Sequence, residues 1–187
     1  MIKSLSAAML AATLIAAPAS AQTSRAAPSA AAMKAAMEFG KTEQDYGMQT
    51  GMTGAVALRT SEIAVRQASN PMVKSFAESE VMEQSTLSKV LMEHSQMAGR
   101  PLPPPQPDPA MAGMITQLQA ARGADFDRMY IRGQIDGHEK LLTIQENYIR
   151  SGRNAHLKHV AMLARGHIMD HLKALRTMEG QIRTASR

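Results

Sequence analysis

The chain has 187 residues, with 21 Lys and Arg against 16 Asp and Glu, and a formal net charge of +5. This length is enough for one domain with its own core. The charge excess is small, the basic residues are dispersed, and aromatic residues make up 3% of the chain, so nucleic-acid binding is not predicted. The chain has no cysteine, which excludes disulfide bonds and a lipid-modified N-terminal cysteine.

The composition favours an all-α fold. Ala, Met, Leu, Gln and Arg dominate, and these residues are good helix formers. Sustained runs of β-branched and aromatic residues at period two, which would predict strands, are missing. We interpret the 16 methionines as adaptable core packing that compensates for only three Phe and three Tyr, rather than as thioether ligands for Cu(I).

The N-terminus has the features of a cleavable signal peptide over residues 1–21. Lys3 supplies a positive charge, residues 7–17 form an apolar stretch of 11 residues, and residues 19–21 form a small-x-small cleavage site. The apolar stretch is too short for a membrane anchor, and no later segment is long and apolar enough to span a membrane. Cleavage before Gln22 predicts export to the periplasm.

Residues 22–41 are rich in Ala and Ser and are expected to form a flexible lead-in outside the core. Apolar residues spaced by threes and fours then predict a first long helix over 42–69 and a second over 71–98. The inward face predicted for the first helix contains Met48, Met52, Leu58 and Glu62. Asn70 and Pro71 end the first helix and start the second, as N-cap and first-turn residue. Gly47, Gly51 and Gly54 weaken the first helix.

Residues 99–110 form a stiff crossover, because six prolines between positions 100 and 110 exclude a helix there. Asp108 is a candidate cap for a short helix that ends near Arg122. Two further long helices are predicted over 125–150 and 154–182, separated by Ser151 and Gly152. Tight turns within each helix pair and one long connection between the pairs predict a ferritin-like four-helix bundle, which we assign to a domain over residues 42–183.

Three segments carry a family resemblance. They are Asn70-Pro71-x-Val73-Lys74-x-Phe76-Ala77, then Phe126-Asp127-x-x-Tyr130-x-x-x-Gln134-Ile135-x-x-His138, and His171-Leu172. In order and spacing they resemble the bacterial exported domain-of-unknown-function 4142 family. The resemblance implies a ferritin-like fold and leaves the biochemical role open. The family usually has an Asp-His pair in its second helix, and Glu83-Gln84 occupies the matching positions here.

Six polar residues are predicted to lie on the apolar faces of the helices. They are Glu62, Glu80, Gln84, His138, His167 and His171. His138, His167 and His171 with Glu62 or Glu80 could bind one zinc, copper or manganese ion. Alternatively, the six side chains form a satisfied polar layer that fixes the helix register without any metal. A di-iron site of the ferritin type is not predicted, because the chain has no Glu-x-x-His motif.

The sequence contains no motif for nucleophilic catalysis or for phosphate binding. The leading hypothesis is therefore an exported, non-enzymatic helical protein without a cofactor, with a structural, stress-related or partner-binding role. The alternative is a periplasmic metal-binding protein that uses the inward His and Glu residues. The sequence identifies no specific protein partner and no oligomeric state.

Overall fold

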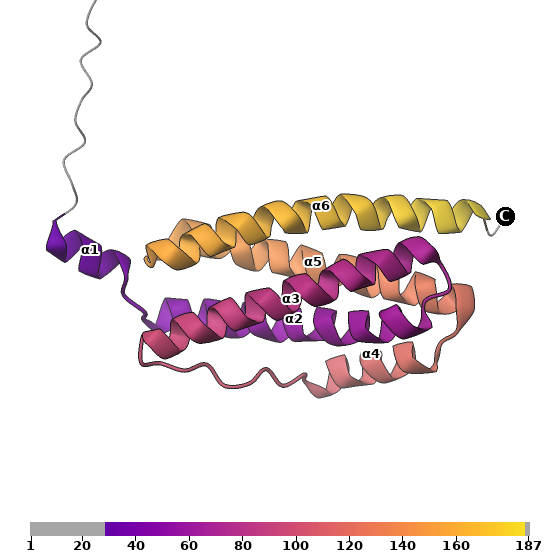
Figure 1. Ribbon diagram of the computed structural model, residues 1–187, viewed down its shortest axis with the longest axis horizontal. Coiled ribbons are helices and arrows are strands. Elements are labelled where there is room, and N and C mark those ends of the chain that lie inside the picture. The colour runs from indigo at the N-terminus through magenta and orange to yellow at the C-terminus, as the bar shows by residue number, and fades with distance from the viewer. Residues whose placement is uncertain (1–28, 186–187) are drawn as a thin grey trace, which may run out of the picture.

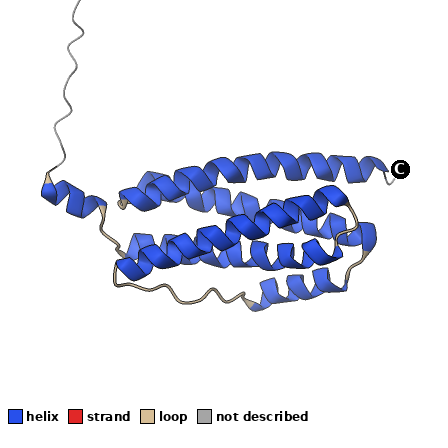
Figure 2. Cartoon of the chain, viewed as in Figure 1, coloured by secondary structure: helices blue, strands red, loops and turns tan. Residues whose placement is uncertain are grey.

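The computed structural model describes residues 29–185, so the predicted signal peptide lies outside the described residues. The all-α prediction is confirmed, because this part of the chain contains helices and no strand (Figure 2). The helices are α1 (Ala30–Ala36), α2 (Lys41–Gln67), α3 (Pro71–Met97), α4 (Pro109–Ala120), α5 (Gly123–Ser151) and α6 (Ala155–Ala185). The predicted count of four is not confirmed, since two short helices, α1 and α4, accompany the four long ones.

The helix ends follow the local capping chemistry. The Asn70 side chain accepts a hydrogen bond from the Met72 amide at 2.8 Å, and Pro71 is the first residue of α3. The Asp108 side chain caps α4 in the same way, through the Met111 amide at 2.9 Å. Such caps satisfy amides that have no partner inside the helix, which explains why the predicted boundaries lie within a few residues of the observed ones.

The four long helices form two antiparallel hairpins, α2 with α3 and α5 with α6, which meet through α2 and α5 (Figure 1). The short helix α4 packs against α2 and α5, and α1 lies beyond one end of the long helices. Between α3 and α4 the proline-rich segment runs as a loop. Its Leu102 packs so closely on α2 that a Cβ at Gly47 would lie 2.6 Å from Leu102 Cδ1. Gly47 therefore allows the crossover to approach the helix.

The buried face of α2 differs from the predicted one by about one residue. The predicted face contained Met48, Met52, Leu58 and Glu62, which are exposed or half-buried. The buried face consists mainly of small and polar residues, among them Thr50, Gly54, Ala57, Ser61 and Ala64, and it also includes Tyr46, Val56 and Ile63. Small side chains allow α2 to approach its two neighbours closely, and the predicted Met48, Met52 and Leu58 lie beside the core rather than inside it.

Polar side chains connect α2 to α5 inside the core. Gln145 Oε1 accepts a hydrogen bond from the Tyr46 hydroxyl at 2.7 Å, and Gln134 Nε2 donates to Thr60 Oγ1 at 2.9 Å. The hydroxyls of Ser61 and Tyr130 are 2.8 Å apart. Hydrogen bonds are directional, so they specify the register between two helices more strictly than apolar packing alone.

Two buried carboxylates hold the inter-helix turns. Asp127 of α5 accepts hydrogen bonds from the amides of Ser69 and Asn70 in the α2–α3 turn. Glu43 of α2 accepts hydrogen bonds from the Tyr148 hydroxyl at 3.1 Å and from the Arg153 amide in the α5–α6 turn at 3.2 Å. Each hairpin turn is thus attached to the other hairpin. None of the helices in residues 29–185 is long and apolar enough to cross a membrane.

We predict that Glu43 contributes to stability in a pH-dependent way. Burial alone would raise the pKa of its carboxyl group, but hydrogen bonds from the amides of Arg153 and Gly40 and from the Tyr148 hydroxyl outweigh burial and lower the pKa. A lowered pKa in the folded state stabilises the protein above about pH 4.5, and this stabilisation is lost as the pH falls further. Between pH 7 and pH 3, the free energy of unfolding measured with urea should therefore decrease less for Glu43→Gln than for the wild type.

The matched control is Asp45→Asn, because Asp45 pairs with Lys41 on the surface. This variant should keep the pH dependence of the wild type. Equal pH dependence in Glu43→Gln and the wild type would contradict the assignment.

Candidate metal centre

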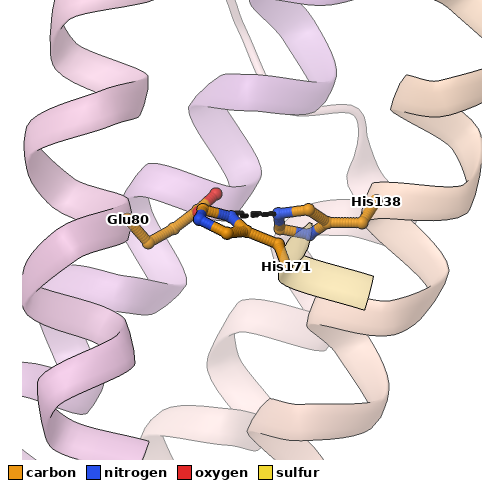
Figure 3. Close-up of side chains that lie close together, drawn as sticks. All are labelled: Glu80, His138 and His171. Carbon is orange, nitrogen blue, oxygen red and sulfur yellow. Dashed lines mark hydrogen bonds and ion pairs between the residues drawn. The ribbon is translucent and has the colours of Figure 1, made fainter. Parts of the chain in front are cut away.

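Three potential metal ligands from three helices face one another inside the bundle: Glu80 of α3, His138 of α5 and His171 of α6 (Figure 3). His138 Nε2 and His171 Nδ1 are 3.2 Å apart. Glu80 Oε2 lies 3.0 Å from His171 Nδ1 and 3.5 Å from His138 Nε2. Within residues 29–185 this is the one place where at least three His, Asp or Glu ligand atoms gather so closely.

A backbone hydrogen bond fixes the orientation of the His138 ring. Its Nδ1 lies 2.7 Å from the Gln134 carbonyl oxygen, one helical turn earlier. A carbonyl oxygen can only accept, so Nδ1 carries the proton. In the neutral ring this places the lone pair on Nε2, which faces the cluster. Metal-binding histidines in proteins are commonly oriented through their second nitrogen in this way.

The Glu80 carboxylate is fully buried, and its two oxygens differ in their surroundings. Oε1 accepts a hydrogen bond from Gln84 Nε2 at 2.9 Å, whereas Oε2 has no hydrogen bond and only the ion-pair contacts with the two rings. Burial alone would raise the pKa of this carboxyl group, but His138 and His171 outweigh burial and lower the pKa to about 2. Glu80 is therefore a carboxylate with one free oxygen directed at two imidazoles.

His171 lies between two carboxylates. Its Nδ1 faces Glu80, and its Nε2 is 3.4 Å from Glu83 Oε1. Burial alone would lower the pKa of the ring, but Glu80 and Glu83 outweigh burial and raise it above 6.5. Without a metal, a protonated His171 places one proton inside the triangle of ligand atoms and directs the second toward Glu83.

The cluster has a closed side and an open side. Phe76 covers one side, with its ring centroid 5.0 Å from that of His171 in an edge-on arrangement. On the other side, a groove of about 360 Å³ separates α3 from α6, and His138, Gln84 and His171 form part of its wall. The remaining wall is mainly apolar and includes Leu87, Val90, Leu141, Val160, Leu163 and Ile168. A small ion or molecule can thus approach the cluster along this groove.

The structure brings together three of the five predicted ligands and separates the other two. Glu62 lies on the outer side of α2 and pairs with Arg59 at 2.9 Å. The side chain of His167 is 67% exposed, and its Nδ1 is 4.0 Å from Glu83 Oε2. His167 is exposed because the buried face of α6 contains Ile168, Leu172 and Leu175, and His167 lies outside this face.

The supporting roles of Glu83, which lies beside His171, and of the Gln134 carbonyl, which holds His138, were not predicted from the sequence. Gln84 was predicted to belong to the inward polar layer, and the structure pairs it with Glu80, four residues earlier on the same face of α3. The methionines also differ from the prediction: of the 14 that lie within residues 29–185, eleven are exposed, and Met178 is buried in the core.

We predict that Glu80 stabilises the metal-free protein far more than Glu62 does. Glu80→Gln removes the charge that compensates His171 in a buried site, so in EDTA at pH 6 the free energy of unfolding should fall by about 3 kcal/mol. Glu62→Gln removes only an exposed ion pair and should cost less than about 1 kcal/mol. Urea unfolding followed by circular dichroism measures both values. Similar losses in the two variants would contradict the geometry of the cluster.

Comparisons with known proteins agree with this fold. Among curated proteins, none matches the chain significantly. A solved DUF305 fragment from Deinococcus radiodurans has 13% identity and a TM-score of 0.69, over 76% of this chain and 97% of the fragment. CopM in its Cu(I)-bound form has 18% identity and a TM-score of 0.65, over 74% of this chain and 96% of CopM. CopM in its Cu(II)-bound form gives the same values.

At these identities, the likeness to the solved structures concerns the fold alone. The sequence itself is more informative: the profile described as "Domain of unknown function (DUF4142)" matches residues 23–178, most of the chain. The resemblance noted in the sequence is thereby confirmed, and the chain belongs to the DUF4142 family.

Proposed function

We propose that this protein is an exported, non-enzymatic helical protein that binds one divalent transition-metal ion through Glu80, His138 and His171. The observation that carries the proposal is the convergence of three ligand atoms at 3.0 to 3.5 Å in the protein interior. Of the two hypotheses drawn from the sequence, metal binding is the one that this geometry favours.

The size of the triangle suits a metal ion. A tetrahedral ion with bonds of about 2.0–2.1 Å separates its ligand atoms by about 3.3 Å. A circle through the three atoms has a radius of about 1.9 Å, so an ion at bonding distance from all three would lie just outside their plane. Glu80 Oε2 is compatible with this site: in the metal-free protein the proton of His171 compensates this buried carboxylate, and a bound metal ion would take over that role.

The donor set narrows the choice of metal. Two imidazole nitrogens and one carboxylate oxygen suit Zn²⁺ and Cu²⁺, whereas Mn²⁺ prefers sites richer in oxygen. In the general affinity order of divalent ions, Cu²⁺ binds such a site more tightly than Zn²⁺. The neighbours described as Cu(I)-bound and Cu(II)-bound CopM support a copper ion by analogy of fold. The fourth position would open toward the groove, which has room for water.

The neighbours of the three ligands are arranged to keep them in place. Gln134 holds His138, Gln84 holds Glu80, and Glu83 accepts the remaining N–H of His171 once a metal has displaced the proton from its Nδ1. Because Glu80 and Glu83 raise the pKa of His171, the ring keeps its proton to a higher pH than a free imidazole, and metal binding must release this proton. Metal affinity should therefore increase with pH.

Export and domain organisation belong to the same proposal. We infer that the signal peptide over residues 1–21 is removed and that the mature protein is periplasmic. In this view the four long helices form a ferritin-like bundle over residues 42–183. The lead-in over 22–41 precedes it, and the expectation that the whole lead-in lies outside the core is wrong at its end, where Phe39 is buried against the bundle. If no metal binds, the cluster serves as a polar layer that fixes the helix register, and a structural or partner-binding role is then the better hypothesis.

The test measures metal affinity in the mature protein and in two variants. Elemental analysis after export, followed by Zn²⁺ and Cu²⁺ titrations against chelators of known affinity, should give one ion per chain at the cluster. His171→Ala should weaken Zn²⁺ binding by at least about 100-fold, because one of three ligands is lost. His167→Ala is the matched control on the same helix and should change the affinity less than about threefold, since His167 lies outside the triangle.

The pH dependence gives an independent check. Between pH 6 and pH 7 the Zn²⁺ affinity of the wild type should rise by up to about tenfold, because one proton is released from His171. Equal Zn²⁺ affinity in the wild type and His171→Ala would disprove the proposed site.

A further inference from the structure

A second groove between α3 and α6 lies next to the groove beside the Glu80 cluster, at the end of the bundle nearest to α1 (Figure 1). It has a volume of about 440 Å³, and Val90 and Val160 line both this groove and the one beside the Glu80 cluster. Its wall contains three histidines and two methionines: His94, His156, His159, Met37 and Met97. These residues come from α3, α6 and the segment that joins α1 to α2.

Two of the imidazoles are close enough to share one ion. The ring centroids of His94 and His156 are 6.1 Å apart. Two imidazoles that bind one ion at about 2.0 Å place their centroids about 5 to 6.5 Å apart, depending on the angle at the ion. The His138 and His171 rings, at 5.3 Å, fall within the same range. Phe39 packs beside His94, with ring centroids 5.8 Å apart, and so restricts the His94 ring from one side.

The second groove differs from the Glu80 cluster in the chemistry of its ligands. Met37 and Met97 are exposed and offer thioether sulfurs, which are soft ligands that favour Cu(I) and similar ions over Zn²⁺. The acidic residue in this wall, Glu93, is exposed and has Lys89 as a partner at 3.8 Å. A site with imidazole and thioether ligands and little negative charge suits a monovalent soft cation better than a divalent one.

We propose a second metal site, formed by His94 and His156 with Met37 and Met97, that binds a monovalent soft ion of the Cu(I) or Ag(I) class. The site is separate from Glu80, His138 and His171 and does not depend on the function proposed for them. This site also accounts for the exposure of the two apolar methionines, because their flexible, unbranched thioether side chains can close over an ion that the two imidazoles bind.

The test uses Ag⁺, which is not redox-active under these conditions, on the full mature chain. Isothermal titration of Ag⁺ in competition with free histidine gives the affinity, and anaerobic Cu(I) titration against bicinchoninate repeats the measurement with copper. His94→Asn/His156→Asn should weaken Ag⁺ binding at least about tenfold. Met37→Leu/Met97→Leu keeps the apolar volume but removes both sulfurs, and should weaken binding by about three- to tenfold.

The matched control is Met72→Leu/Met169→Leu, which removes two exposed methionines that line neither groove. Its Ag⁺ affinity should equal that of the wild type, and the Zn²⁺ affinity of all three double variants should also be unchanged. Unaltered Ag⁺ binding in the histidine variant would overturn the site. Unaltered binding in the Met37→Leu/Met97→Leu variant would overturn the role of the thioethers. A simultaneous loss of Zn²⁺ binding would overturn the independence of the two sites.

Discussion

The arrangement of this protein depends on one carboxylate that has no contact with water. Glu80 is fully buried, and two imidazoles from the other hairpin compensate its charge. A buried charge is tolerated only with such partners, so α3 can pack against α5 and α6 in few alternative registers. Gln84, which the family resemblance presented as the replacement of a histidine, supports this arrangement by holding the second oxygen of Glu80.

Much of the fold could be predicted from the sequence, because capping residues and prolines act locally. Asn70, Pro71 and Asp108 specify helix ends through bonds to the nearest amides. Which face of α2 is buried could not be predicted from such local signals. Its methionines suggested one face, whereas the buried face consists mainly of small and polar residues together with Tyr46, Val56 and Ile63. Close packing against two neighbours favours small side chains, and the periodicity of large apolar residues does not detect that preference.

The positions of the candidate ligands were predictable where the buried face of the helix was correctly identified. Glu80 and His138 lie on the buried stripes of α3 and α5, and both were found. Glu62 was included because of the misplaced face of α2, and His167 because helical spacing alone groups it with His171. The second cluster could not be found in the sequence, since His94 and His156 are 62 positions apart and meet only when α3 and α6 lie side by side.

The connections between the helices have a mechanical consequence. Turns join α2 to α3 and α5 to α6, and the hairpins meet through α2 and α5, while α3 and α6 have no covalent link and approach each other less closely. The α2–α5 contact therefore holds the two hairpins together, and the α3–α6 side is the less tightly packed edge of the bundle. Glu80 and His171 lie on opposite sides of that edge. An ion bound between them would add a second link between the two hairpins, and its departure would leave the Glu80–His171 ion pair to hold this edge alone.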